Sequence, residues 1–252
     1  MRQPRERRDD QAAYVLHTYP YRETSAIAEA FTAGYGRVAL MARGARRGRS
    51  ELRGLLQAFQ PLTLSWSGAG ELKTLVKAEW RGGLARVGGS ALLCGFYLNE
   101  LLLKLLPRED PHSQLFDAYE RALMQLAGGA EQASVLRRFE VTLLAELGYA
   151  LPLTHEVDTG RPVDPDERYY YAFDRGPRLR AAEPGRRYPQ VRGATLLALA
   201  QNDFSAPEAA AEAKRLMREV LDHYLEQRAI VSRRVVRDLQ AMEEDGGKAI
   251  DD

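Results

Sequence analysis

The chain has 252 residues, 45% hydrophobic and 28% charged, which is the composition of a soluble globular protein with one large or two ordinary domains. Its single cysteine, Cys94, excludes an intramolecular disulfide and a Cys-rich zinc site. No apolar run reaches membrane-spanning length and the first residues are charged, so we expect no membrane span, no signal peptide and a cytosolic location.

The net charge of +1 conceals a basic first third. Residues 1–80 contain 13 Lys and Arg against 8 Asp and Glu, whereas the remaining 172 residues contain 23 against 27. We therefore expect any polyanion to contact the N-terminal end of the chain.

Five short strands are predicted in the first 80 residues, at 12–19, 25–32, 37–41, 55–66 and 72–80. The segment 25–32 also fits a helix by periodicity, but the Gly-Tyr-Gly turn that follows it favours a strand. Pro61 inside the fourth run indicates an edge or a bulge. We expect the charged start of the chain to be a frayed tail, and the five strands to form a small closed barrel of the OB type.

Five arginines without an intervening acid lie in and after the third predicted strand: Arg37, Arg43, Arg46, Arg47 and Arg49. Guanidinium groups on a glycine-containing loop suit a ligand with repeated negative charge, of which phosphate backbones are the commonest. Taken alone, the stretch fits a solvated basic loop equally well.

Helical periodicity replaces strand periodicity after two Gly-Gly pairs at 82–83 and 88–89. Helices are predicted at 90–106, 113–126 and 133–147, with Pro107 and Gly148 as terminators and with Met124 in the core. Residues from about 154 to 190 are rich in Pro, Gly and charge and predict an irregular insertion with one hairpin near 169–173. Further helices are predicted at 193–200, at 206–228 with Pro207 after a Ser205 cap, and at 232–242.

The predicted fold class is therefore α+β with two domains: an OB-fold barrel at 1–80, followed by a mostly α-helical domain at 81–252. Signatures of catalysis are largely absent, since the chain has no P-loop, no Gly-x-Ser-x-Gly elbow and no histidines at metal-ligand spacing. We expect no cofactor, no metal and no enzymatic activity. Glu100 and Glu140 lie in apolar helices and each needs a partner, which Arg137 or Arg138 could supply; we favour structural ion pairs over a catalytic role.

A small barrel with a basic face is a common scaffold for single-stranded nucleic acid. The charge would come from Arg37, Arg43, Arg46, Arg47, Arg49, Lys73 and Lys77. Tyr14, Tyr35 and Phe59 could stack on bases, although each also fits a half-core position. Affinity would then fall steeply with salt.

Several motifs in fixed order are familiar: YRETS at 21–25, ARGAR at 42–46, GELKTL at 70–75, YLNEL at 97–101, RRFE at 137–140 and LGY at 147–149. Across residues 12 to about 163 the chain resembles the RecO family of bacterial recombination mediators. The resemblance implies binding of single- and double-stranded DNA, annealing of complementary strands and loading of RecA at the bacterial nucleoid, without covalent chemistry. It also implies RecR and the C-terminal tail of single-stranded DNA-binding protein as partners.

Many members of this family carry a four-cysteine zinc site after the LGY motif. The matching segment here, 153–160, contains no cysteine, so we expect a zinc-free member whose loop is held by other contacts.

An acidic tail that ends in Phe needs an apolar pocket for the ring and a cation for the carboxylates. Arg137 is the first candidate for the cation, in line with its motif, and Arg138 is the second. Tyr119, Leu123 and Leu126 on the preceding predicted helix would supply the pocket. The alternative is that both arginines pair only with Glu140 or with helix ends.

The sequence thus predicts a DNA-annealing mediator. A rival hypothesis is a protein-interaction scaffold whose barrel does not touch DNA. A nuclease is a third possibility, but no acidic cluster has convincing metal-ligand spacing.

Overall fold

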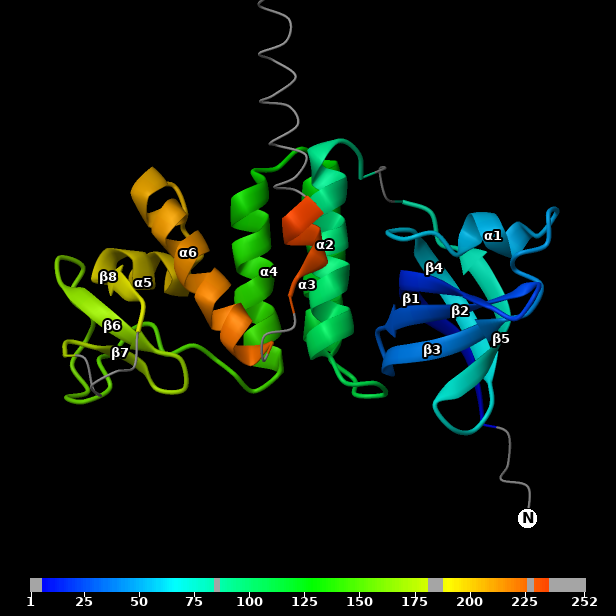
Figure 1. The fold of residues 1–252 in the computed structure, drawn as a ribbon, viewed down its shortest axis with the longest axis horizontal. Coiled ribbons are helices and arrows are strands. Elements are labelled where there is room, and N and C mark those ends of the chain that lie inside the picture. Colours follow the sequence, from blue (N-terminus) through cyan, green and yellow to red (C-terminus); the bar gives the residue numbers. More distant parts are fainter. Residues whose placement is uncertain (1–5, 84–86, 181–187, 226–228, 236–252) are drawn as a thin grey trace, which may run out of the picture. The chain divides into compact units, whose positions relative to one another are not determined.

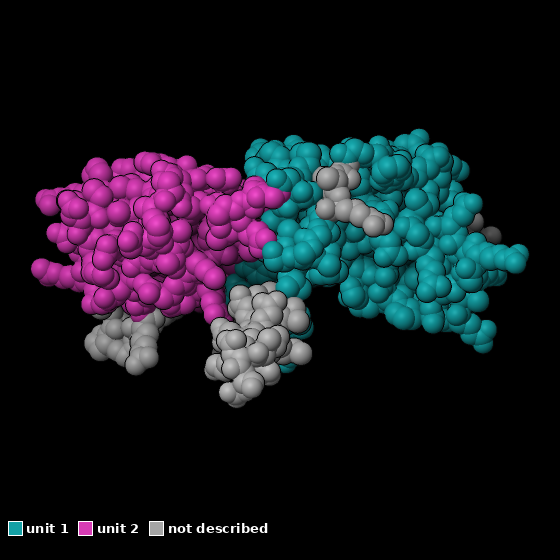
Figure 2. Space-filling view, turned by 90° about the horizontal axis from the view of Figure 1, so that it is seen from above, with its two compact units in different colours: residues 1–128, 230–252 teal, residues 129–229 magenta. Residues whose placement is uncertain are grey.

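A computed structural model of the chain describes residues 6–83, 87–180, 188–225 and 229–235 (Figure 1). The chain forms two compact units. Unit 1 comprises residues 1–128 and 230–252, and unit 2 comprises residues 129–229, shown in teal and magenta in Figure 2.

Unit 1 begins with a closed barrel of five strands, as predicted for the OB type. The closing order is β1-β2-β3-β5-β4, and all neighbours are antiparallel except the parallel pair β3 and β5. The strands are β1 (Arg7–Tyr21), β2 (Ser25–Thr32), β3 (Gly36–Ala42), β4 (Pro61–Ser67) and β5 (Leu72–Trp80). Leu62, Leu64 and Trp66 alternate along β4 and fill the barrel core, each 1% exposed or less.

Two expectations for the barrel are wrong. The charged start is not a frayed tail from Arg7 onward, because Arg7 pairs with Ser67 and extends β1; residues 1–5 lie outside the described residues. The predicted strand at 55–66 is instead the short helix α1 (Glu51–Leu55) followed by β4. Pro61 is the first residue of β4, a position where its missing N–H is tolerated.

Gly36 allows the barrel to approach the segment after α2 (Ser90–Leu105) closely. It has a φ of +63°, and a Cβ there would lie 1.9 Å from the carbonyl oxygen of Asp110. Only glycine satisfies both conditions without a backbone shift.

Helices α2 and α3 (Ser113–Ala127) pack on the barrel within unit 1. Asn99 of α2 donates a hydrogen bond to the carbonyl of Leu16 at 2.9 Å and accepts one from the Tyr119 hydroxyl of α3. The rings of Tyr14, Phe116 and Tyr119 form one cluster, with Tyr14 5.7 Å and 5.3 Å from the other two. Met124 was expected in the core but is 48% exposed, since it lies on the outer side of α3.

Glu100 holds the returning chain against α2. Its carboxylate accepts hydrogen bonds from the backbone N–H groups of Val231 at 2.7 Å and Ser232 at 2.8 Å, and it pairs with Lys104 at 2.8 Å. The partner of Glu100 is therefore Lys104 together with backbone, not Arg137 or Arg138. Residues 231–235 are helical, and the rest of the predicted helix at 232–242 lies outside the described residues.

Unit 2 combines helices with a small antiparallel sheet of order β7-β6-β8. The elements are α4 (Gln132–Glu146), β6 (Arg168–Ala172), β7 (Gly176–Arg178), β8 (Gln190–Arg192), α5 (Gly193–Gln201) and α6 (Pro207–Tyr224). The hairpin predicted near 169–173 is the β6–β7 pair. Pro207 does begin α6, but the N-cap is Ala206 without a side-chain cap, so the Ser205 cap was wrong. Across the segments that the structure describes, no helix is both long and apolar enough to cross a membrane.

The loop after the LGY motif is organised by the carboxylate of Glu156, which is 3% exposed. It accepts hydrogen bonds from the Thr159 hydroxyl, the Thr159 N–H at 2.7 Å and the Asp158 N–H at 3.1 Å. These bonds, led by the Thr159 hydroxyl, lower the pKa of Glu156 despite its burial. The Glu156 carboxylate thus provides hydrogen-bond acceptors for the N–H groups of this turn.

Candidate nucleic-acid interface

The seven cations predicted to bind DNA fall into two groups. Arg43, Arg46, Arg47 and Arg49 are all exposed on the turns after β3. No acidic side chain of the described residues forms an ion pair with any of them. Their charge is therefore available to a ligand.

Arg37 is committed to the interior of unit 1. Its guanidinium pairs with the buried carboxylate of Glu29 at 3.1 Å and donates to the carbonyl of Leu106 at 3.0 Å. Arg108 contacts the same carboxylate, so Glu29 joins β2, β3 and the segment after α2.

Lys73 and Lys77 are also paired. Lys73 contacts Glu109 and donates to the carbonyl of Gly70 at 3.0 Å, and its side chain is only 12% exposed. Lys77 is half exposed but pairs with Glu79 at 2.8 Å, a hydrogen bond that raises the pKa of the lysine. Local acids offset both charges, which separates these lysines chemically from the unpaired arginines.

The arginine loop docks against the turn between β1 and β2. The Arg46 backbone N–H donates to the carbonyl of Thr24 at 2.9 Å, and its guanidinium donates to the carbonyl of Arg22 at 3.1 Å. This contact places Arg22 next to the four loop arginines. Arg22 is exposed, and its guanidinium carbon lies 5.3 Å from the centre of the Tyr21 ring. We call Arg22, Arg43, Arg46, Arg47 and Arg49 the arginine surface. Arg22 could not be found from spacing, because 24 residues separate it from Arg46.

An aromatic row leads along β1 to this surface. His17, Tyr19 and Tyr21 alternate on the strand, so successive members lie about 7 Å apart. The His17 and Tyr19 rings are 4.4 Å apart between centroids, and Tyr19 is 46% exposed. The period-two pattern of this row was visible in the sequence.

The aromatics predicted to stack on bases lie mainly in the core. Tyr14 and Phe59 are 1% and 7% exposed. Tyr35 is half buried, with its ring 5.5 Å from that of Trp66. His17 and Tyr19 of the aromatic row are exposed instead, whereas Tyr21 is half buried.

The predicted tail-binding residues lie in both units. Tyr119, Leu123 and Leu126 are buried within unit 1, at 0%, 0% and 2% exposure. In unit 2, the guanidinium of Arg137 pairs with buried Glu140 and donates to the carbonyl of Lys214 at 3.3 Å. This is the structural ion pair anticipated for Glu140. Arg138, the second candidate, is the exposed member of the arginine pair.

The chain is a protein with an OB-type barrel followed by a mostly helical region. Comparison with known sequences identifies its family. Residues 8–84 match the family model described as Recombination protein O N terminal, and residues 88–234 match Recombination protein O C terminal. The chain belongs to the RecO family of DNA repair proteins.

Curated relatives agree with this assignment over nearly their whole length. The chain is 52% identical to the DNA repair protein RecO of Aromatoleum aromaticum, with 94% of this chain and 99% of the relative covered. It is 51% identical to that of an Azoarcus species, with 93% and 98% covered, and 47% identical to that of Nitrosospira multiformis, with 94% and 98% covered.

Proposed function

We propose that the barrel binds single-stranded DNA, with phosphates on the arginine surface and bases on the aromatic row. The observation that carries this proposal is the set of four exposed loop arginines without an acidic partner among the described residues. Arginine suits phosphate because its planar guanidinium offers several donors in a fixed geometry. An exposed ring such as that of Tyr19 stacks on any base, so the expected binding is independent of sequence.

Annealing follows from charge neutralisation. A strand held on the arginine surface has part of its phosphate charge offset, which weakens its repulsion of a complementary strand. Both single and double strands then bind through their phosphates. Every step is binding, so the protein acts without nucleotide, cofactor or covalent catalysis.

The helical part recruits the barrel to coated DNA at the bacterial nucleoid. Arg138 supplies the cation for the acidic C-terminal tail of single-stranded DNA-binding protein, because its side chain is exposed whereas that of Arg137 is committed to Glu140. The protein works with RecR, and through it helps to load RecA.

The deciding experiment is the annealing of complementary oligonucleotides, with and without single-stranded DNA-binding protein, beside a salt titration of oligonucleotide binding. Annealing that is accelerated by the protein and binding that weakens with salt are expected. A barrel that binds no oligonucleotide at low salt would instead favour an interaction scaffold.

The tail site has its own matched pair of variants. Arg138→Ala is expected to weaken binding of an acidic C-terminal peptide about tenfold, the loss of one charge-assisted hydrogen-bonded pair, and to leave the affinity for naked DNA unchanged. Arg137→Ala is expected to destabilise unit 2, because it removes the partner of a buried carboxylate. Equal peptide binding by Arg138→Ala and the wild type would contradict the assignment.

A further inference from the structure

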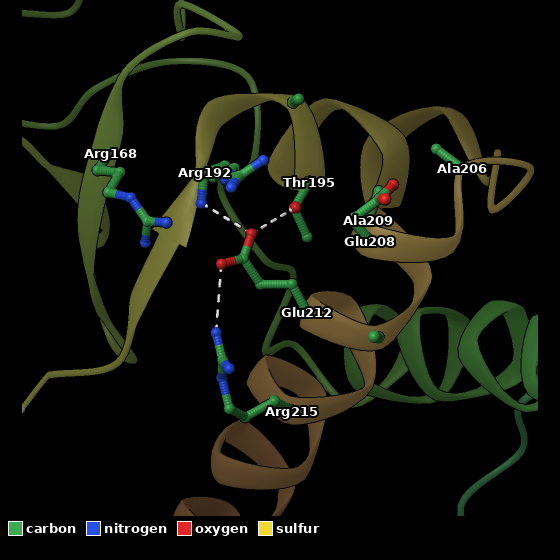
Figure 3. Close-up of a pocket in the computed structure, with 10 residues that line it drawn as sticks. Arg168, Arg192, Thr195, Ala206, Glu208, Ala209, Glu212 and Arg215 are labelled. Atoms are coloured by element: carbon green, nitrogen blue, oxygen red, sulfur yellow. Dashed lines mark hydrogen bonds and ion pairs between the residues drawn. The ribbon is translucent and has the colours of Figure 1, made fainter.

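Unit 2 contains a pocket of about 470 Å³ that the barrel-centred function does not use (Figure 3). Its walls come from β6, β8, α5 and α6, and its volume lies within the range of ligand sites. Arg168, Arg192 and Arg215 line it, together with four alanines.

The two strand arginines form an unusual pair. Arg168 of β6 and Arg192 of β8 are direct partners in the antiparallel register. Directly opposed residues have Cβ atoms about 5 Å apart, and like charges in this arrangement repel. Both side chains are exposed, and no ion pair joins either of them to an acid in the described parts of the chain. An anion bound between them would relieve the repulsion.

Glu212 holds the pocket together, and among the described residues it forms no ion pair with the guanidinium of Arg168 or Arg192. One carboxylate oxygen accepts hydrogen bonds from the Arg192 backbone N–H at 3.0 Å and the Thr195 hydroxyl at 2.6 Å, and the other accepts from Arg215 at 3.2 Å. Its contacts therefore hold α6 against the start of α5. The second acid, Glu208, lies at the opposite end of the pocket from Arg168, beside Ala206 and Ala209 (Figure 3).

The remaining lining determines what kind of anion fits. Ala194, Ala206, Ala209 and Ala211 present small apolar surfaces that let a backbone approach closely. No aromatic side chain lines the pocket among the residues that the structure describes, so this lining offers no platform for stacking a base. We propose that this pocket binds the sugar–phosphate backbone of a DNA strand, with a phosphate between Arg168 and Arg192 and the deoxyribose against the alanines.

This second contact rests on the proposed function only in that the protein handles DNA, and it is separate from the arginine surface. A protein with two backbone sites can hold two strands at once, which annealing requires. The two sites differ in one testable property: the barrel uses bases, and the pocket does not.

The test uses the full chain and an abasic decamer, which has phosphates and sugars but no bases. In a background with Arg43, Arg46 and Arg47 changed to Ala, the additional double substitution Arg168→Gln and Arg192→Gln should lower decamer affinity at least tenfold. It should also reduce the salt slope by about 0.7, because the contact with the one phosphate held between the two arginines is lost. The exposed, mutually repelling positions make both substitutions compatible with folding.

The control is Arg175→Gln, which removes one positive charge, as each of the two pocket substitutions does, from an exposed position between β6 and β7, outside the described pocket lining. It should change decamer affinity less than twofold. Unchanged binding by the double variant would overturn the proposal. So would displacement of the decamer by equimolar inorganic phosphate, which would indicate a free-phosphate site, or selective binding of an acidic peptide. Failure of the barrel proposal would appear separately, as unchanged binding of a normal oligonucleotide by the barrel triple variant alone.

Discussion

Removing charge from the arginine loop should change the salt dependence of DNA binding by a calculable amount. We consider the triple substitution of Arg43, Arg46 and Arg47 by Ala, three exposed side chains without acidic partners among the described residues. Each phosphate contact contributes about 0.7 to the slope of log affinity against log salt for single strands, so the slope should fall by about 2. Over a fourfold range of salt, the wild type should lose about 20-fold more affinity than the variant.

The assay is fluorescence anisotropy of a labelled oligonucleotide at 50, 100 and 200 mM salt. At the middle concentration the Debye length is about 10 Å. Lys77→Ala is the matched control, because Lys77 is an exposed cation on the same barrel whose charge is offset by Glu79. Its slope should remain within about 0.3 of the wild-type slope, less than half of one phosphate contact.

The reasoning would be refuted if the triple variant kept the wild-type slope. It would also be refuted if Lys77→Ala lowered the slope as much per residue as the loop substitutions, because pairing would then not distinguish the two groups of cations. Circular dichroism of both variants should match the wild type, since none of the substituted side chains is buried.

Three further predictions concern stability. Glu29→Ala should lower the free energy of unfolding by about 3 kcal/mol in urea titrations, because it leaves the guanidinium of Arg37 without its carboxylate; a loss below about 1 kcal/mol would argue against this role. Glu156→Gln should flatten the acid limb of the melting curve: the lowered pKa of Glu156 contributes stability above its unfolded value of about 4.3, and this is lost as pH falls through the folded pKa. A Tm that declines in parallel for both proteins below pH 4.5 would contradict it. Gly36→Ala should destabilise unit 1 by more than about 2 kcal/mol, whereas Gly34→Ala, which meets only a flexible side chain at 3.2 Å, should cost less than about 1 kcal/mol; equal losses would rule out the close approach as the cause.

The overall architecture was predictable because each part keeps one hydrophobic period. The barrel strands alternate and the helices repeat every three to four residues, so most elements were predicted within a few residues of their observed ends. The exceptions are the start of β1, which lies at Arg7 and not at residue 12, and the start of β4, which lies at Pro61 and not at residue 55. Helix α1 was missed because none of its five residues is buried and its N-cap, Ser50, makes no side-chain capping bond. Only Leu52 and Leu55 of α1 pack against the core, and a helix of five residues is too short to show a helical period.

The candidate site was only half predictable, because local charge says nothing about distant partners. Spacing identified the loop arginines, but it could not distinguish Arg37, whose acid lies on the neighbouring strand. The same limit applies to Arg137, whose hydrogen bond to Lys214 spans 77 residues. Arg22 entered the surface only through the docking of one turn on another. Sequence identifies which residues carry charge, and the fold decides which charges are already used.

The contact between Glu100 and the returning chain has a consequence for synthesis. The two groups that it joins, Glu100 and Val231, are 131 residues apart, and the whole of unit 2 lies between them. At a translation rate of about 5–20 residues per second, the ribosome needs on the order of 10 s to make that interval. The Glu100 carboxylate on α2 therefore lacks its backbone donors during the time in which unit 2 leaves the ribosome and can fold. Unit 1 therefore begins to be made first and is completed last. In a nascent chain that stalls before Val231, the sequence of unit 2 would be complete while Glu100 of unit 1 still lacked its backbone donors.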